Sequence, residues 1–472
     1  VVIDPGVTLT ITGTISQNSG VIKGSSTSNL IITGTSGTIA FDQTTPGTTN
    51  VLKNLTISGS GTTTLGNALN ITGGTLFGTV TVGSGATLAT GGYLTLKSNA
   101  TGTASIGNSA GTISGNVNVE RYVSSAGRRW RFLSSPVQSK TIADWRDQFC
   151  ITGPGTTTNS TIGDLNSNGW HQTYNNTINS TAAATTSVRK YDEVNSTSLN
   201  LNLGWSDVTT ATALTAGRGF RTFIRGPVAD KSSQLGAGAN SYTQAAFTLS
   251  LTGAINSGDI AAPSLTYNQT GWNLLGNPYP CAFDWNAFHD AGRSGNSGTD
   301  YTYIDANVYI YDGTSNSYKS YSATANSGTL TNGIIPSGAG FFVQATASSP
   351  TLTFKETYKT TSAPIALHKT TMNDEFILKF LKDEKESDEI IVKMLDGASL
   401  NKDGYDINKL GNENLNLSAY GTDSNLLTLS AIPFVIEETR IKLNIEATEV
   451  GTYKFDFTNM DQFDASVSVS LL

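Results

Sequence analysis

The sequence predicts an all-β protein, with an N-terminal parallel β-helix-like solenoid followed by tandem antiparallel β-sandwich domains. Three observations predict this fold class. Apolar alternations of a few residues recur between Gly, Asn and Ser clusters, a pattern typical of short strands separated by turns. No long stretch shows the apolar period of a helix. One motif is written twice in the chain, which indicates an internal duplication.

The composition favours an extracellular protein. Charged residues make up 14% of the 472 residues, whereas ordinary soluble domains have about 25%. Gly, Ser, Thr and Asn take their place, so the surface is expected to be polar but weakly charged. The net charge of −7 argues against a nucleic-acid partner or an anionic membrane. No apolar run approaches the roughly 20 residues that a membrane span requires, so none is expected.

Residues 1–118 are expected to form the solenoid. Segments such as 29–33, 54–57 and 93–96 alternate apolar with Thr or Asn side chains and are separated by glycine-containing turns. In stacked coils, such polar side chains can form ladders with their counterparts in the next coil. At roughly 20 residues a coil, this region would make about six coils. An antiparallel Gly/Thr-rich sandwich is the alternative.

The repeated motif defines two sandwich units, 119–262 and 263–362. The first copy lies in 129–136 and the second in 271–280, with Trp130 equivalent to Trp272. Further equivalent positions follow in nearly the same order in both units, so chance does not explain the match. These are Leu133 and Leu275, Asp144-Trp145 and Asp284-Trp285, Tyr191 and Tyr311, and Gly217–Phe220 and Gly338–Phe341.

Each copy of the motif is followed by an Asp-Trp pair, the best candidate for a short helix. Asp144 or Asp284 would be its N-cap, because an aspartate side chain can accept hydrogen bonds from the first free N–H groups. The tryptophans recur at equivalent positions, so we expect them in the shared core rather than on a sugar-binding surface. Residues 247–251 alternate and predict a closing strand of the first unit.

Residues 363–472 predict a third, Ig-like β-sandwich. The dense charge run 382–389 lies between two apolar stretches and indicates a hairpin with a solvated turn. The pattern ends inside a strand at Leu472, so we expect the natural protein to continue beyond it. It also begins at Val1 as though within a strand, which suggests a trimmed fragment.

The segments 271–280 and 335–343 resemble those of large secreted cell-surface proteins of the Bacteroidetes, exported by the type IX secretion system. Residues 375–472 look like the β-sandwich that often precedes the C-terminal sorting domain of that family, which is not in this sequence. The resemblance covers roughly residues 125–472. It implies export through the type IX machinery by way of that missing domain, and a cell-surface location. It also implies a role as an adhesin, in some relatives linked to gliding motility.

Three sets of residues are candidates for specific roles. Asp164, Asn166 and Asn168, followed by Gly169, match the first half of a calcium loop, although Asn175 stands where a bidentate glutamate is required. A plain Asn-Gly turn is the alternative. Cys150 and Cys281 each lie beside a copy of the motif. They could form one disulfide or remain two separately buried thiols.

The ligand-binding candidates are the unduplicated aromatics Trp170, Tyr174 and Trp205, whose ring faces could stack on sugars. The arginines at 128, 129 and 131 could bind an anionic glycan or pack the solenoid against the first unit. No catalytic motif is present, and the three histidines, His171, His289 and His368, are scattered. We therefore expect a non-catalytic adhesin or stalk with a glycan or protein partner. A carbohydrate-binding accessory region of a larger secreted hydrolase is the alternative.

Overall fold

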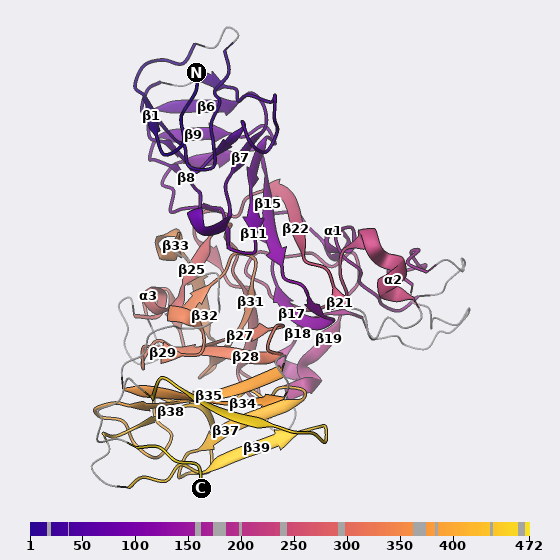
Figure 1. The fold of residues 1–472 in the computed structure, drawn as a ribbon, viewed down its shortest axis with the longest axis vertical. Helices are drawn as coiled ribbons and strands as arrows, with labels where there is room; N and C mark the ends of the chain where they lie inside the picture. Colours follow the sequence, from indigo (N-terminus) through magenta and orange to yellow (C-terminus); the bar gives the residue numbers. More distant parts are fainter. Residues whose placement is uncertain are drawn as a thin grey trace.

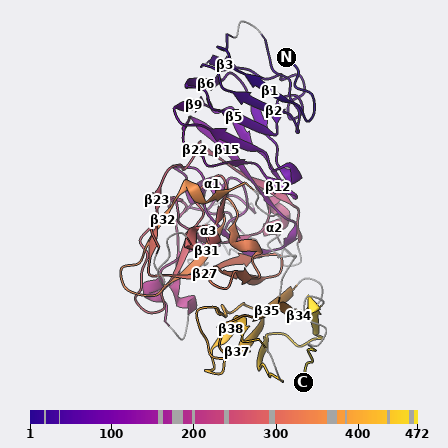
Figure 2. The same ribbon diagram turned by 90° about the vertical axis from the view of Figure 1, so that its left-hand side faces the viewer.

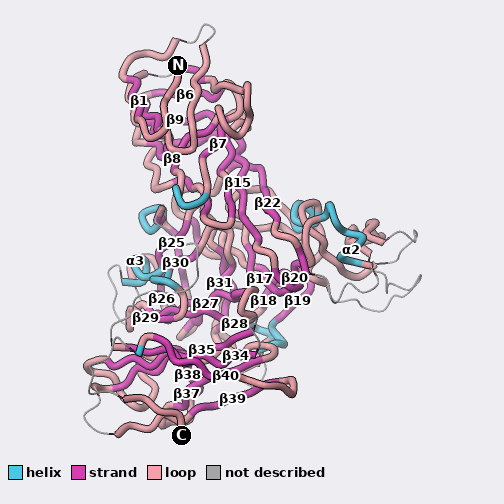
Figure 3. Tube along the Cα trace, in the orientation of Figure 1, coloured by secondary structure: helices cyan, strands magenta, loops and turns pink. Residues whose placement is uncertain are grey.

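The structure is a computed structural model of an elongated molecule with its termini at opposite ends (Figure 1). It describes residues 1–16, 20–35, 37–155, 162–172, 186–197, 201–236, 243–290, 298–361, 374–382, 386–434, 438–460 and 468–472. Along the long axis lie the solenoid, then the two duplicated units side by side, and then the C-terminal domain (Figure 1 and Figure 2). Strands and loops predominate and the helices are short (Figure 3). The predicted all-β fold class is confirmed.

Three parallel sheets form the solenoid, and each coil after the first contributes one strand to each sheet. The strand orders are β1-β2-β5-β8-β13, β4-β7-β10-β15 and β3-β6-β9-β14. The chain visits the sheets in a fixed order and completes about four coils. The strands are β1 (Thr8–Ile11), β2 (Asn29–Ile32), β3 (Gly37–Ile39), β4 (Val51–Leu52), β5 (Asn54–Ile57), β6 (Gly61–Leu65), β7 (Leu69–Ile71), β8 (Thr79–Val82), β9 (Ala86–Ala89), β10 (Leu94–Leu96), β13 (Ser105–Ile106), β14 (Thr112–Ser114) and β15 (Asn116–Val123).

The expected number of six coils is wrong because each coil is longer than assumed. Asn54 donates its side-chain amide to Asn29, 25 residues earlier, and the backbone N–H of Thr79 donates to Asn54 over the same step. The strand register repeats this spacing, since Asn29 pairs with Asn54 and Asn54 with Thr79. The polar ladder expected of stacked coils is therefore present, with a longer period.

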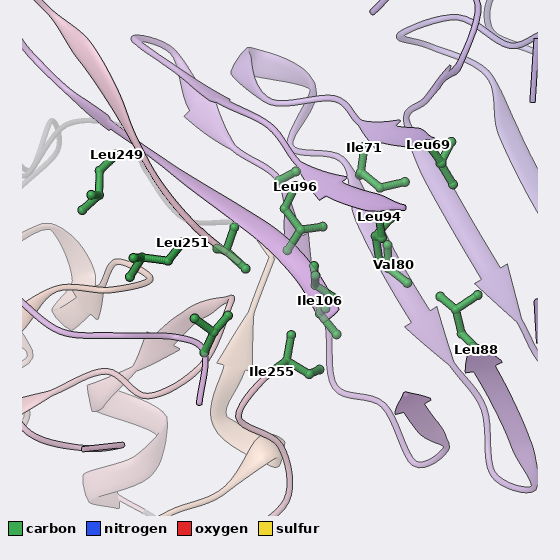
Figure 4. Close-up of a cluster of buried hydrophobic side chains, with 14 of the residues drawn as sticks. Leu69, Ile71, Val80, Leu88, Leu94, Leu96, Ile106, Leu249, Leu251 and Ile255 are labelled. Atoms are coloured by element: carbon green, nitrogen blue, oxygen red, sulfur yellow. The ribbon is translucent and has the colours of Figure 1, made fainter. Parts of the chain in front are cut away.

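Apolar side chains at alternate strand positions fill the interior of the solenoid. Figure 4 shows Leu69, Ile71, Leu94 and Leu96 stacked between successive coils. Burying one such side chain contributes about 1.5–3 kcal/mol, so this column stabilises the stack of coils. The inward residues of β2, β5 and β8 are at most 1% exposed: Leu30, Ile32, Leu55, Ile57, Val80 and Val82.

The last strand of the solenoid continues into the rest of the molecule. β15 pairs antiparallel with β22 (Phe247–Ala254) over its whole length. Leu249 and Leu251 of β22 thereby join the solenoid core (Figure 4). The strand expected to close the first unit exists, but it extends a solenoid sheet. On the solenoid side, β15 also contacts β11 (Ser98–Asn99) and β12 (Gly102–Thr103), and β12 contacts η1 (Gly74–Leu76).

The two duplicated units have the same sheet topology. The first sheet has the order β17-β20-β18-β19, and the second β24-β31-β27-β28, extended by β29. The register also agrees, because Leu133 pairs with Phe220 as Leu275 pairs with Phe341. The strands are β17 (Arg129–Leu133), β18 (Val188–Tyr191), β19 (Trp205–Asp207), β20 (Phe220–Ile224), β24 (Trp272–Gly276), β27 (Ile304–Asp312), β28 (Ser317–Ser322), β29 (Ser327–Gly328) and β31 (Gly340–Ala345).

The units contact each other reciprocally, as the subunits of a twofold dimer do. The Ser134 N–H donates to the Gly338 carbonyl at 2.9 Å, and the Gly276 N–H donates to the Gly217 carbonyl at the same distance. The two hydrogen bonds are equivalent, because Ser134 corresponds to Gly276 and Gly338 corresponds to Gly217. The bridges Leu133–Ala339 and Arg218–Leu275 are exchanged in the same way. The duplication has therefore produced an internal pseudo-twofold interface.

The helix predicted after each motif is present in both units. In α3 (Trp285–Asp290), Asp284 accepts the Ala287 N–H and caps the helix as expected. In α1 (Ile142–Arg146) the expected cap is wrong. Thr141 is the N-cap there, and Asp144 is the third helical residue, whose carboxylate accepts the Thr141 N–H in a capping box.

Smaller elements complete the two units. Unit one also contains β16 (Ala126–Gly127), β21 (Thr243–Gln244), η2 (Glu193–Asn195), η3 (Leu201–Gly204), η4 (Val228–Asp230) and α2 (Lys231–Leu235). Unit two also contains β23 (Ile260–Ala261), β25 (Ala282–Asp284), β26 (Tyr301–Thr302), β30 (Ile334–Ile335), β32 (Thr351–Phe354), β33 (Lys359–Thr360), η6 (Thr331–Gly333) and η7 (Glu356–Tyr358).

The C-terminal domain is a seven-stranded sheet of order β39-β37-β38-β35-β34-β40, with β36 also paired to β38. The predicted hairpin is present as β34 and β35. Its charge run is only partly as expected, because Asp388 and Glu389 are buried. The strands are β34 (Glu375–Lys382), β35 (Glu386–Met394), β36 (Ile407–Asn408), β37 (Leu415–Tyr420), β38 (Leu426–Ile432), β39 (Leu443–Ala447) and β40 (Lys454–Thr458).

The two buried carboxylates have buried lysine partners. Lys409 lies 2.5 Å from Asp388 within the domain, and Lys319 of β28 lies 2.5 Å from Glu389 across the domain boundary. A buried charge is tolerated only when it is paired and hydrogen-bonded. The pair formed by Lys319 and Glu389 therefore fixes unit two and the C-terminal domain in one arrangement.

Candidate functional site

A cavity of about 390 Å³ lies where the solenoid meets both duplicated units. We call it the junction cavity. Ala100, in the turn between β11 and β12, is an exposed residue of its lining. The lining combines arginines, hydroxyl groups and aromatic rings, among them Ser98, Thr103, Arg121, Tyr122, Ser124, Arg131, Phe132, Tyr311, Asp312, Ser337 and Thr361.

Arg121 reaches the cavity from β15. It continues the inward-facing series of Val117 and Val119, at the point where the strand leaves the solenoid. Its Nη1 donates to the Ser337 carbonyl at 3.1 Å. Burial, with a smaller contribution from the like charge of Arg131, lowers the pKa of Arg121 to about 10. The guanidinium still carries its full positive charge at neutral pH.

Arg131 reaches the same cavity from β17. Its Nη2 lies 3.4 Å from both the carbonyl and the hydroxyl oxygen of Ser124. Its Nε is buried and has no hydrogen-bond partner in the part of the chain that the structure describes. Burial lowers the pKa of Arg131, and the charge of Asp312 acts in the opposite direction. Two cations and one anion therefore line the cavity.

The other two arginines of the cluster at 128–131 have different surroundings. Arg129 lies 3.4 Å from Glu386 of the C-terminal domain. Arg128 lies over the ring of Phe223 at 6.0 Å. The three arginines therefore do not act as one patch, and only Arg131 faces the junction between the solenoid and the units.

The aromatic candidates are placed differently from the expectation. Trp170 is 1% exposed, with its ring close to Gly153, so it offers no stacking face and that prediction is wrong. Trp205 is half-buried against Phe132, Tyr191 and Phe342 in the interface between the units. Tyr174 lies outside the described residues.

Three of the four duplicated tryptophans are core residues as predicted, and the fourth, Trp130, packs at the edge of the core. Trp145 and Trp285 are fully buried and Trp272 is 6% exposed. Trp130 is half-buried, with the Arg221 guanidinium 4.1 Å from its ring centre. The recurrence of these tryptophans at equivalent positions of the two units predicted this burial.

The calcium candidate forms a turn closed by its own side chains. The Asn166 side-chain oxygen accepts the N–H groups of Asn168 and Trp170, both at 3.0 Å. The Asn168 amide donates to the Pro154 carbonyl. These contacts match the Asn-Gly turn that was the alternative. Calcium binding by Asp164, Asn166 and Asn168 stays a prediction.

The two cysteines are free thiols in separate surroundings, so the possible disulfide is not formed and the alternative holds. The Cys281 thiol donates to the Thr360 carbonyl at 3.3 Å, and the Cys150 thiol lies 3.9 Å from the Pro227 carbonyl. Burial raises the pKa of Cys150 to about 12 and that of Cys281 to about 11. Both thiols are therefore unreactive at neutral pH.

The two histidines that the structure describes, His171 and His289, are buried within the fold. His171 is buried and accepts the Ile151 N–H, and burial lowers its pKa to about 4. His289 is buried and stacks on Tyr301. His368 falls outside the described part. Among the described residues, no group of three His, Cys, Asp or Glu side chains could hold a metal ion.

The sequence patterns above do not predict the junction cavity, although one signal for it exists. Val117, Val119, Arg121 and Val123 alternate with outward residues, and an arginine at an inward position marks a place where the core gives way to a polar site. The second arginine of the cavity, Arg131, lies on another strand, and only the fold brings it to the cavity.

Comparison with known proteins gives one match. A family profile described as a domain of unknown function, DUF8693, matches residues 158–469, well over half of the chain. The matched region begins inside the first unit and extends through the second unit into the C-terminal domain. No curated protein and no solved structure matches the chain. In the described residues no helix has the length and apolar character of a membrane span. The chain belongs to the DUF8693 family, a family of unknown function.

Proposed function

We propose that this chain is a non-catalytic adhesin or structural stalk of the bacterial cell surface, exported by the type IX secretion system. The export route and location rest on the resemblance of residues 125–472 to such proteins. The mechanical role rests on one structural observation, the absence of a linker between the solenoid and the units: strand β15 passes directly from one into the other and pairs with β22. Its partner would be a surface glycan or a protein.

Three further contacts support a stiff stalk. The Ile106 N–H at the base of the solenoid donates to the Pro280 carbonyl in the repeated motif of unit two. The Ser109 N–H donates to Glu356, and the same carboxylate accepts the Gly258 N–H. The solenoid is thus bonded to both units, and paired strands leave little freedom for a hinge at this junction.

Small-angle X-ray scattering of the purified chain tests the stiffness. We expect the data to fit one elongated conformation. Leu251 is buried at the base of the solenoid, so Leu251→Asp should loosen the joint and require bent conformers in the fit. The neighbouring exposed Thr252→Asp is the matched control and should leave the scattering unchanged. A wild-type chain that already requires several bent conformers would overturn the stalk proposal.

Labelling of the producing bacterium tests the location. Antibodies against the solenoid should label intact cells, and external protease should remove the signal while a cytosolic marker stays intact. Deletion of the gene should reduce binding of the cells to glycan- or protein-coated surfaces. Label that appears only after the cells are broken would contradict a surface protein.

A further inference from the structure

We propose that the junction cavity binds a small carboxylate-bearing ligand of the sugar-acid class, held between Arg121 and Arg131. The site goes beyond the proposed stalk role and does not depend on it. It brings together residues from β15 of the solenoid and β17 of unit one with lining residues from unit two. The ligand would therefore sit where three parts of the molecule meet.

The charges of the cavity favour an anion. Arg121 and Arg131 line the same cavity, and the like charge of Arg131 adds to the larger effect of burial that lowers the pKa of Arg121. Among the lining residues that the structure describes, Asp312 is the one carboxylate. Its oxygens also accept the Thr314 N–H and the Ser315 hydroxyl in the turn after β27, each at 2.9 Å. The lining therefore carries two positive charges against one shared negative charge, and a bound anion would balance them.

The hydrogen-bond donors of the two arginines favour an oxyanion. A guanidinium has five N–H donors in a fork that fits a carboxylate. Arg121 donates to the Ser337 carbonyl, and Arg131 makes only long contacts to Ser124. The Arg131 Nη2 is held by Ser124 only at 3.4 Å among the described residues, so a carboxylate oxygen in the cavity could form a shorter, charge-assisted hydrogen bond with it.

The walls and the size favour a sugar acid over a purely apolar acid. Hydroxyl groups of Thr103, Ser105 and Thr361 line the cavity together with the aromatic residues Tyr122 and Tyr311. Hydroxyl groups can exchange hydrogen bonds with a sugar, and aromatic faces pack on its C–H groups. The volume of about 390 Å³ lies at the lower end of the range for small-molecule sites, roughly 300–1,000 Å³. It suits a ligand of one or two rings.

Isothermal titration calorimetry with sodium glucuronate tests the site, with glucose and sodium chloride at matched ionic strength as controls. We expect saturable binding of glucuronate at one site and none of glucose. Arg121→Gln and Arg131→Gln should each weaken binding about tenfold or more, because a charge-assisted hydrogen bond is lost. Arg440→Gln is the matched control, since Arg440 is exposed and pairs only locally with Glu438, and it should leave the affinity unchanged.

A second pair of variants keeps the test decisive if the arginine variants do not fold. Ala100 is exposed at the rim, so both Ala100→Glu and Ala100→Lys should fold. A rim charge acts at a distance, so glutamate should weaken glucuronate binding about threefold and lysine should strengthen it by a similar factor. Equal affinity of both variants would place any bound glucuronate elsewhere and overturn the proposal.

Sodium sulfate separates a sugar acid from an inorganic oxyanion. Tighter binding of glucuronate than of sulfate, sensitive to the Ala100 variants, would support the assignment. Sulfate binding as tightly as glucuronate would overturn it, because the sugar ring would then contribute nothing. Failure of glucuronate to bind at millimolar concentrations would also overturn it, and would leave the stalk proposal untouched because that proposal is tested by scattering and cell labelling.

Discussion

The two duplicated units have the same strands in the same register and both touch the solenoid and the C-terminal domain, yet the kind of contact differs between them. Unit one is bonded to the solenoid, since β22 completes a solenoid sheet. Unit two is bonded to the C-terminal domain, since Lys319 of β28 pairs with the buried Glu389. Lys319 corresponds to Ser206 of unit one, because Trp205 pairs with Tyr191 as Tyr318 pairs with Tyr311. The two copies share one framework, and differences in a few side chains, such as Lys319 in place of Ser206, distinguish their contacts.

The largest difference between the units should appear when this lysine is removed. Lys319→Met would leave Glu389 buried beside the more distant Lys379, and breaking a buried ion pair costs about 3–5 kcal/mol. Urea unfolding would measure the loss. Lys379→Met is the matched control: it faces the same carboxylate at 4.0 Å but is 30% exposed, so its loss should stay below about 1 kcal/mol. Equal losses of unfolding free energy in the two variants would mean that the burial of Lys319 does not determine the strength of its ion pair with Glu389.

The pseudo-twofold axis gives the next test. Gly276 and its equivalent Ser134 face each other across the axis, and a Cβ on Gly276 would stand 2.3 Å from the Ser134 Cβ and 2.6 Å from the Arg218 carbonyl oxygen. Two side chains therefore cannot face each other here without a shift of the backbone. Gly276→Ser should destabilise the protein by about 1–3 kcal/mol, because the interface has no room for it.

The exchange of the two residues distinguishes a crowded axis from a general defect. In the double variant Ser134→Gly/Gly276→Ser, the serine lies on the other side of the same axis. We expect it to recover part of the stability lost in Gly276→Ser, measured by thermal unfolding. A double variant that is less stable than Gly276→Ser by the full cost of Ser134→Gly would show that the two sites are independent.

How far the sequence predicts this molecule depends on whether a feature is local. The duplication, the post-motif helices and the hairpin of β34 and β35 follow from local patterns and are present. The coil number was missed because the turns within a coil have no fixed apolar pattern, so the period of 25 residues is visible only in the pairing of Asn29 with Asn54.

Long-range features could not be predicted for a physical reason. Burial of a charge depends on a partner that the local sequence does not contain, as for Glu389, whose partner Lys319 comes from another domain. Cys150 and Cys281 look equivalent in the sequence, but each lies in the core of its own unit. Arg121 of β15 and Arg131 of β17 line the junction cavity together only in the fold, so neither segment of the sequence indicates the cavity by itself.

A buried carboxylate of unit one provides a pH-dependent test. Glu193, 2% exposed, accepts the N–H groups of Asn268, Gln269, Thr270 and Gly271 in the loop that leads into β24. Burial alone would raise the pKa of Glu193, but the four donors outweigh it and hold the pKa below its ordinary value. The equivalent position in unit two is Gly313.

Because this pKa is lowered on folding, the stabilisation is present above the unfolded-state value of about 4.5 and is lost as the pH falls through the folded value. Glu193→Gln should cost about 2 kcal/mol at neutral pH, and the difference from wild type should shrink under acid conditions. Urea unfolding across this pH range would measure it. Glu438→Gln, at an exposed position, should show no such pH dependence. A loss that does not change with pH would contradict a role for the charge.

The smallest expected effect compares two equivalent tryptophans. The Trp285 Nε1 donates to the Ala306 carbonyl at 2.8 Å, whereas the Trp145 Nε1 is buried without a hydrogen-bond partner among the described residues. Replacing either with phenylalanine removes the same volume, so the cavity cost is shared. Trp285→Phe also loses a hydrogen bond, while Trp145→Phe removes an unpaired donor. We expect Trp285→Phe to be more destabilising by about 1 kcal/mol.

The size of this difference is limited by the acceptor. The Ala306 carbonyl also accepts the Ala323 N–H at 3.2 Å, so it keeps one partner after the tryptophan is gone. Parallel urea unfolding of the two variants would measure the difference. Equal losses would mean that the second bond compensates fully, and a greater loss for Trp145→Phe would mean that unit one depends more strongly on ring packing. Either result would show whether the cores of the two units are stabilised to the same extent by their equivalent tryptophans.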